Sequence, residues 1–262
     1  MAPPAPGRRF AATRRVRLGD VTPDGHVRLD ALARYLQDVA ADDVIDAGID
    51  GEAGWVVRRS TVELNVRPRY QEMIDLVTWC SGTGAAWAER RTTIGVGGGT
   101  VIEASSLWVC MDPVSMRPAP LAERFFAVYG PSSKSRSVRS TLRLSASAPG
   151  GAETTAWPLR SADFDVLGHV NNAIAWAALE QSAGTIASGR SIVQAEVEYR
   201  RPIEGREEMT VLSTSGSGLV RSWILDGTGQ TAITAALSLS SAEPGSTTDL
   251  RATDRRATDL RA

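Results

Sequence analysis

The sequence predicts an α+β fold made of two copies of one unit, each a long helix followed by antiparallel strands. An apolar pattern with helical spacing occurs twice, from Leu29 and from about Asn172. A polar, glycine-containing loop precedes each of these segments, and stretches of alternating apolar and polar residues follow each of them. The 262 residues are enough for two units that each bury a core.

The two loops are related by a constant offset. Residues 17–26 and 160–169 have the same length, and a shift of 143 positions (169 − 26) aligns an aspartate, a glycine and a histidine. A proline then follows the first strand after each helix, Pro68 in the first copy and Pro202 in the second. We interpret this pattern as a tandem duplication of one structural unit.

The elements of each copy can be placed from the same periodicities. In the first copy, a helix is expected over residues 29–48, with strands over 13–18, 55–66, 74–80, 87–96 and 101–111. In the second copy, a helix is expected over residues 172–188, with strands over 193–201, 209–213, 219–225 and 233–239. Gly97-Gly98-Gly99 and Asp226-Gly227 are typical hairpin turns.

Three segments lack periodic apolar residues. The proline-rich start and the repetitive tail cannot bury enough surface to offset the entropy of ordering, so we expect both to be disordered. A stretch rich in Ser, Gly and Ala separates the two copies and is expected to be a flexible linker. The predicted organisation is a leader, a first unit, a linker, a second unit and a tail, at 1–12, 13–130, 131–152, 153–241 and 242–262.

Composition excludes several classes of protein. The net charge of −1 gives no general attraction to nucleic acid, and no apolar run approaches the length of a membrane span. No signal-peptide pattern is present, and Cys80 and Cys110 lie in apolar runs typical of buried, reduced thiols, so a cytoplasmic protein is expected. Phosphate-loop, serine-nucleophile and zinc-ligand spacings are absent, so we expect no cofactor and no metal.

The loop before the second helix is the strongest candidate site. Residues 160–172 combine two aspartates, one of only two histidines, a glycine and two asparagines. Such groups ahead of a helix can move a proton while nearby backbone N–H groups hold an anion. An ordinary capped loop would explain the two asparagines, but it explains the histidine and both aspartates less well.

The segment Asp-Phe-Asp-Val-Leu-Gly-His-Val-Asn-Asn, residues 163–172, resembles the signature loop of hotdog-fold thioesterases. The two-unit length makes the chain similar to the acyl-acyl carrier protein thioesterases of plants and bacteria. Further similar stretches are residues 55–57, 104–111, 157–160, 176–181 and 198–201. The resemblance implies tandem hotdog folds that hydrolyse a fatty acyl thioester of acyl carrier protein, with a non-catalytic first unit that supplies the acyl pocket.

The same resemblance places Asp165 and His169 at catalytic positions. Asp165 is expected to activate water or to attack the carbonyl itself, and its structural alternative is a turn-closing side chain. His169 is expected to orient the thioester or the water, or else to hold the loop.

Four neighbours are expected to contact the substrate. Gly168 allows a close approach of the backbone, and the N–H groups of His169 and Val170 are candidate donors to the oxyanion. Asn171 and Asn172 are expected to cap the helix at the edge of the site.

The chain departs from the plant pattern at three positions. Leu167 stands where plant members have an asparagine, and Pro202 and Ile203 stand where they have a glutamate and a cysteine. Glu204 is a candidate substitute for that glutamate. Glu180 is a candidate second base, with a solvated helix position as its alternative.

Several functions and partners stay open at this point. Rival functions are a coenzyme A thioesterase, a non-catalytic acyl-binding protein, and a hydratase or dehydratase on the same scaffold. Expected partners are acyl carrier protein and a fatty acyl chain, and a monomer and a homodimer are both compatible with the sequence. Basic residues of the linker offer either a docking patch for an acidic partner or a solvated surface, namely Lys134, Arg136, Arg139 and Arg143.

Overall fold

Two helix-and-sheet units follow one another along the chain. The computed structural model describes residues 6–51, 53–187, 189–204 and 208–240. The first unit contains β1 (Phe10–Arg15), α1 (Leu29–Asp46), β2 (Gly54–Leu64), β3 (Met73–Thr83), β4 (Trp87–Val96), β5 (Gly99–Met111) and α2 (Glu123–Ser133). The second contains β6 (Glu153–Trp157), α3 (Asn172–Ile186), β7 (Ile192–Tyr199), β8 (Met209–Gly216), β9 (Leu219–Leu225) and β10 (Thr231–Leu239). The predicted α+β class is confirmed.

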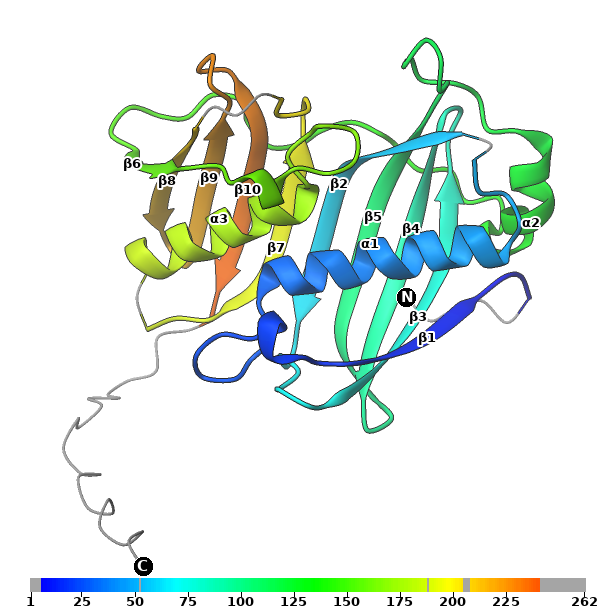
Figure 1. The fold of residues 1–262 in the computed structure, drawn as a ribbon, viewed down its shortest axis with the longest axis horizontal. Coiled ribbons are helices and arrows are strands. Elements are labelled where there is room, and N and C mark those ends of the chain that lie inside the picture. The colour runs from blue at the N-terminus through cyan, green and yellow to red at the C-terminus, as the bar shows by residue number, and fades with distance from the viewer. Residues whose placement is uncertain (1–5, 52, 188, 205–207, 241–262) are drawn as a thin grey trace, which may run out of the picture.

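The strands of both units form one antiparallel sheet, in the order β1-β3-β4-β5-β2-β7-β10-β9-β8-β6 (Figure 1). The units join where β2 pairs with β7, with Thr61 opposite Glu196. The long helices α1 and α3 lie on the same face of this sheet, one over each unit. The duplication therefore produces a single surface on which the two helices meet.

The two helices pack against this face of the sheet through the apolar residues whose spacing predicted the helices. Leu32 and Val39 of α1 are buried, as are Trp176 and Leu179 of α3, and all four belong to one core cluster. Burial of such side chains contributes roughly 1.5–3 kcal/mol each relative to exposure. Because this cluster spans both units, the start of each helix is held in a fixed place relative to the other unit.

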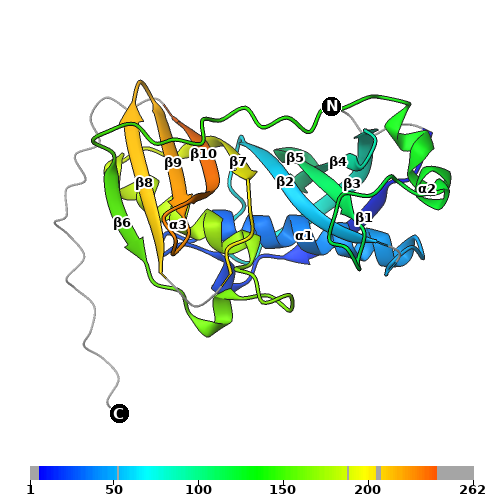
Figure 2. The same cartoon turned by 90° about the horizontal axis from the view of Figure 1, so that it is seen from above.

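The segment between α2 and β6 crosses the opposite face of the sheet (Figure 2). It is bonded to both units, because the indole N–H groups of Trp87 and Trp223 donate to the carbonyls of Val138 and Ser145, each over 2.9 Å. The fully buried carboxylate of Glu198 accepts the backbone N–H groups of residues 143 and 144. The expectation of a flexible linker is wrong here, because the buried indole of Trp223 and the buried carboxylate of Glu198 need these partners.

The basic residues of this segment are not all free for docking. The Arg136 guanidinium forms an ion pair with Glu89 and donates to the carbonyl of Ser81 over 2.7 Å. Its charge is therefore neutralised within the first unit.

The N-terminal segment differs from the expected disordered leader. Residues 10–12 of the expected leader belong to β1, where Phe10 and Ala12 pack against the core. Arg8 pairs with the buried Asp43, with 2.7 Å between Nε and Oδ1. Residues 1–5 and the expected tail lie outside the described residues. Within the described ranges, no helix is long and apolar enough to cross a membrane.

Candidate active site

The loop before α3 closes on itself through its backbone. The N–H of Asp165 donates to the carbonyl of His169 over 2.8 Å, and the N–H of Gly168 donates to the carbonyl of Asp165 over 3.0 Å. Gly168 has a φ of +78°, a conformation that favours glycine. The N–H of Val170 donates to the carbonyl of Ile203 over 2.9 Å, which fixes the loop to the segment after β7.

The carboxylate of Asp165 is held by one of its two oxygens. Its Oδ1 accepts the N–H groups of Leu167 (2.9 Å) and His169 (3.2 Å). Its Oδ2 has no hydrogen-bond partner among the described residues, and the side chain is partly exposed. The turn-closing role of Asp165 is therefore real, and it leaves the second oxygen free to accept a proton.

The two backbone donors expected to hold an oxyanion are already engaged. The N–H of His169 donates to Asp165, and the N–H of Val170 donates to Ile203. That expectation is corrected, because neither group is free for a ligand in this structure. The loop lies at the start of a helix, so the next candidates are the N–H groups of the first helical turn.

His169 has an acidic neighbour. Its Nε2 lies 3.3 Å from Oε1 of Glu204, and the two residues also form an antiparallel bridge. The imidazole is 29% exposed and the carboxylate 68%, so water screens the pair. Glu204 therefore reaches the loop from the segment after β7, two residues later than the glutamate expected from the plant pattern.

Asp163 and Asn171 build the frame around these groups. The buried Asp163 carboxylate accepts from the side chain and the backbone of Arg160. Burial opposes the charge on Asp163, but these bonds lower its pKa overall. Asn171 accepts the N–H of Ala173 over 2.9 Å, which confirms its predicted role as the cap of α3.

A small cavity of about 20 Å³ borders the first residue of α3. It is lined by Asn172, Trp176 and Tyr199 of the second unit and by Gln37 of α1. The N–H of Asn172 and the amide of Gln37 have no hydrogen-bond partner within the described part of the chain. A space of this size holds about one water molecule or one carbonyl oxygen.

A larger cavity of about 300 Å³ lies in the first unit, between α1, α2 and the sheet. Its walls are mainly apolar and include Ala40, Val44 and Phe125. Gln37 and Trp108 line both cavities. The start of α3 and the apolar space of the first unit are therefore neighbours, separated by these two side chains.

Comparison with known proteins now identifies the family. Residues 7–129 match the sequence profile of the acyl-ACP thioesterase N-terminal domain, and residues 147–245 match that of the C-terminal domain. The chain belongs to the acyl-acyl carrier protein thioesterase family. This membership supports hydrolysis of acyl thioesters by the fold described above.

Relatives of this thioesterase occur in bacteria and plants. An uncharacterized protein of Mycobacterium tuberculosis is 26% identical over 219 residues, which cover 83% of this chain and 87% of that protein. The chloroplastic palmitoyl-acyl carrier protein thioesterase of Arabidopsis thaliana is 25% identical over 231 residues, covering 78% of this chain and 54% of the plant protein.

Solved structures confirm the double hotdog fold. A putative oleoyl thioesterase from Lactobacillus plantarum superposes with a TM-score of 0.77 at 18% identity, covering 90% of this chain and 97% of that chain. The 12:0-ACP thioesterase from Umbellularia californica gives a TM-score of 0.75 at 22% identity, covering 88% and 97%.

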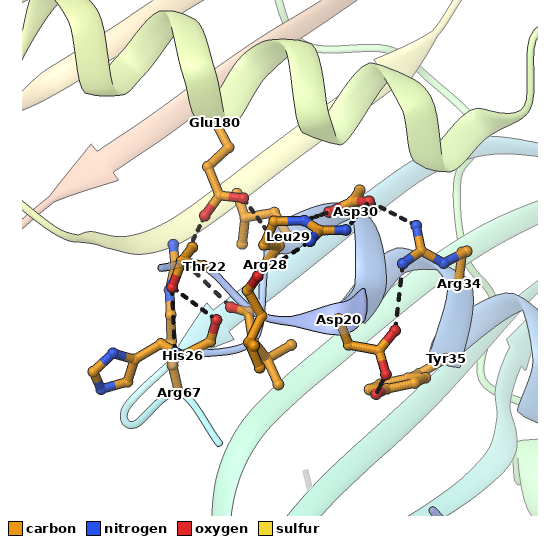
Figure 3. Close-up of polar contacts among 12 residues, drawn as sticks. Asp20, Thr22, His26, Arg28, Leu29, Asp30, Arg34, Tyr35, Arg67 and Glu180 are labelled. Atoms are coloured by element: carbon orange, nitrogen blue, oxygen red, sulfur yellow. Dashed lines mark hydrogen bonds and ion pairs between the residues drawn. The ribbon is translucent and has the colours of Figure 1, made fainter. Parts of the chain in front are cut away.

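The first unit of this thioesterase carries a second copy of the loop. Thr22 occupies the place of Asp165, and its Oγ1 accepts the N–H of His26 over 3.2 Å (Figure 3). The ring of His26 pairs instead with Asp24, with 2.9 Å between Nδ1 and Oδ2. The first copy thus keeps the turn and lacks the turn-closing carboxylate.

Glu180 lies outside the loop and acts between the units. Figure 3 shows its carboxylate reaching from α3 to the start of α1. There its Oε2 accepts the N–H of Leu29 over 2.9 Å, and its Oε1 pairs with Arg67. Both expectations for Glu180, a second base and a solvated position, are corrected, because the side chain is only 18% exposed and caps a helix.

No metal centre was expected. In the described ranges there is no group of three or more His, Cys, Asp or Glu residues that could hold a metal ion. Both cysteines are free and buried, and burial raises the pKa of the Cys80 thiol to about 11.

Proposed function

We propose that this thioesterase hydrolyses the bond between a fatty acyl chain and the phosphopantetheine of acyl carrier protein, releasing a free fatty acid. The observation that carries the proposal is the loop of Asp165, which ends at Asn172 beside two adjoining cavities. This arrangement suits a thioester at the start of α3 with its acyl chain directed past Gln37 into the first unit.

The start of α3 supplies the electrostatic part of the reaction. Asn172 lines the small cavity and its N–H has no hydrogen-bond partner among the described residues, and the positive end of the helix dipole favours negative charge there. In our proposal this N–H donates to the carbonyl oxygen as it becomes an oxyanion. Donors placed in this way stabilise the transition state more than the bound substrate.

Asp165 supplies the proton acceptor. In our proposal its unpaired Oδ2 takes a proton from water as the water oxygen attacks the carbonyl carbon. The tetrahedral intermediate then collapses, the carbon–sulfur bond breaks, and the departing thiolate takes the proton that Asp165 had accepted, which leaves a thiol and a free fatty acid. Direct attack by Asp165 would displace the thiolate and form an anhydride, and attack of ¹⁸O-labelled water on its aspartyl carbonyl would then place label in the peptide that contains Asp165.

His169 and Glu204 act on the position of the water or the thioester. The Glu204 carboxylate, 3.3 Å from the imidazole, favours one ring orientation and one tautomer. Gly168 and Val170 contribute the shape of the loop, and Asn171 contributes the helix cap.

Acyl donors of matched chain length provide the test. The purified protein is assayed with one fatty acyl chain linked either to acyl carrier protein or to coenzyme A. Our proposal predicts turnover of both thioesters, with a higher kcat/KM for the carrier protein. A clear preference for coenzyme A would show that acyl-coenzyme A is the substrate. Binding of the acyl chain without turnover would identify a non-catalytic acyl-binding protein.

A further inference from the structure

The far wall of the larger cavity carries a guanidinium group. Arg90 of β4 lines this cavity together with apolar residues such as Val44 and Phe125. Resting on the proposed function, we propose that the acyl chain accepted here bears an uncharged oxygen, a hydroxyl or keto group, in its distal part. Arg90 is the residue that recognises this oxygen.

The hydrogen bonds of Arg90 come from one nitrogen, and its guanidinium also lies over the ring of Tyr129, with 5.4 Å between Cζ and the ring centroid. Its Nη1 donates to Oδ2 of the fully buried Asp43 over 2.5 Å. The Tyr129 hydroxyl donates to the same oxygen over 2.9 Å, and Arg8 donates to Oδ1 over 2.7 Å. The Asp43 carboxylate is thus already shared among three donors. Burial opposes the charge on Arg90, but Asp43 and Tyr129 raise its pKa overall, so the guanidinium stays protonated.

The other two donor nitrogens of Arg90 are unpaired in a side chain that lines the cavity. Its Nε and Nη2 have no acceptor among the described residues. These two atoms are not sealed inside the protein, because 12% of the side chain stays accessible and the residue borders the cavity. The wall is mainly apolar, and Glu89, the lining acid next to Arg90 in the strand, is already paired with Arg136. A fixed cation with spare N–H groups on such a wall suits an oxygen acceptor.

A plain hydrocarbon tail fits this wall poorly. It would displace water from the N–H groups of Arg90 and leave them unpaired, which is costly in an apolar space. A hydroxyl or keto oxygen would restore the hydrogen bond, and sites of this kind discriminate strongly against analogues that lack the polar group. A carboxylate fits less well, because Asp43 and Asp46 together already balance the charges of Arg90 and Arg8.

The position of Arg90 also defines where the oxygen lies along the chain. Its partner Asp43 is six residues beyond Gln37 on α1, about 9 Å along the helix axis. Since Gln37 borders the cavity at the start of α3, the oxygen lies several carbons away from the thioester carbonyl. The substrate class is therefore a distally oxygenated acyl chain, distinct from chains oxygenated next to the thioester.

Paired acyl chains on one donor test this inference. Plain, distally hydroxylated and distally carboxylated chains of equal length are compared, over lengths of about eight to sixteen carbons. The hydroxylated chain is expected to show a kcat/KM about tenfold or more above its plain counterpart at the best length. Equal values at every length, or a preference for the carboxylated chain, would overturn the proposal.

Two variants locate the effect. Arg90→Lys keeps a positive charge beside Asp43 but loses the planar fork, so the ratio of kcat/KM for the hydroxylated chain to that for the plain chain should fall toward one. Arg91→Lys is the matched control, because Arg91 lies next in the strand and does not line the cavity. Retention of the preference in Arg90→Lys would contradict the assignment.

Binding of free fatty acids separates this inference from the proposed function. Calorimetric titration with plain and hydroxylated fatty acids needs no turnover. If no thioester is hydrolysed, the proposed function fails, while tighter binding of the hydroxylated acid would still support the site. Equal binding of both acids would contradict the site even if hydrolysis is observed.

Discussion

The loop before α1 and the loop before α3 close through equivalent bonds. Thr22 Oγ1 accepts the N–H of His26, and Asp165 Oδ1 accepts the N–H of His169, both over 3.2 Å. The corresponding backbone N–H to carbonyl bond is 2.8 Å in each copy. A hydroxyl is therefore enough to close the turn. The carboxylate adds a second oxygen that the turn does not use.

The helices that follow these loops begin differently. In the first copy, Glu180 and Arg67 fill the space at the first N–H of α1. The shift of 143 residues that relates the loops places Gln37 where the second copy would need that glutamate. An arginine precedes the proline in both copies, but Arg201 before Pro202 pairs with Asp226, 3.3 Å away, and not with the start of the helix. The N-terminus of α1 is therefore covered by an ion pair, whereas the N-terminus of α3 borders a cavity.

Among changes outside the loop of Asp165, the largest effect is expected from closing the start of α3. Gln37→Glu would place a carboxylate where it can accept the N–H of Asn172, as Glu180 does for Leu29. Loss of this donor should lower kcat about hundredfold, which is typical for removal of an oxyanion donor. Gln37→Leu is the control, because it offers no acceptor to that N–H. Equal losses in both variants would contradict the role of the open N–H.

A smaller effect is expected from the acid beside the histidine. Glu204→Gln removes the charge 3.3 Å from His169 and should lower kcat about tenfold. Asp24→Asn changes the acid beside His26 in the first copy and should leave kcat unaltered. A lower kcat in the Asp24→Asn variant would show that the loop of the first copy takes part in the reaction.

The ion pair between the units should affect stability and not chemistry. Glu180→Leu leaves Arg67 and the N–H of Leu29 without their partner, which should cost about 1–3 kcal/mol of unfolding free energy. Urea unfolding measures this cost, and Gln181→Ala, at the exposed next position, is the control. A lower kcat of the folded Glu180→Leu variant at saturating substrate would show that Glu180 takes part in the reaction.

The smallest effect concerns acid stability. The pKa of Asp163 in the folded protein lies below its ordinary value near 3.8, so the unfolded chain binds a proton at this group more readily. Its stabilising contribution is present above about pH 5 and is lost as the pH falls through the folded pKa. The free energy of unfolding of the Asp163→Asn variant should therefore change less with pH than that of the parent protein between about pH 5 and pH 2. Parallel curves of unfolding free energy against pH would contradict this.

Local patterns predicted most of the fold and the loop itself. The helical spacing from Leu29, the turn at Gly168 and the cap at Asn171 all depend on neighbours within a few residues, so the sequence shows them directly. The same holds for the strands, because their apolar and polar residues alternate between the two faces of the sheet.

Contacts between distant segments could not be predicted in this way. Glu180 is 151 residues from Leu29, and helical periodicity gives its face but not its partner. Glu204 reaches His169 because Ile203 pairs with Val170, a register that one sequence does not reveal. The offset of 143 residues was the available signal, since it aligns Glu180 with Gln37 and marks the two helix starts as unlike.

The most direct test converts the second loop into the first. Asp165→Thr keeps a side-chain oxygen for the N–H of His169, as Thr22 does for His26, but removes the free carboxylate oxygen. Steady-state hydrolysis of an acyl-acyl carrier protein and thermal unfolding are measured together on this variant and on the parent. We predict a kcat lower by about 10² to 10⁴-fold with a Tm close to that of the parent. An unchanged kcat in the folded variant would contradict the assignment of hydrolysis to Asp165.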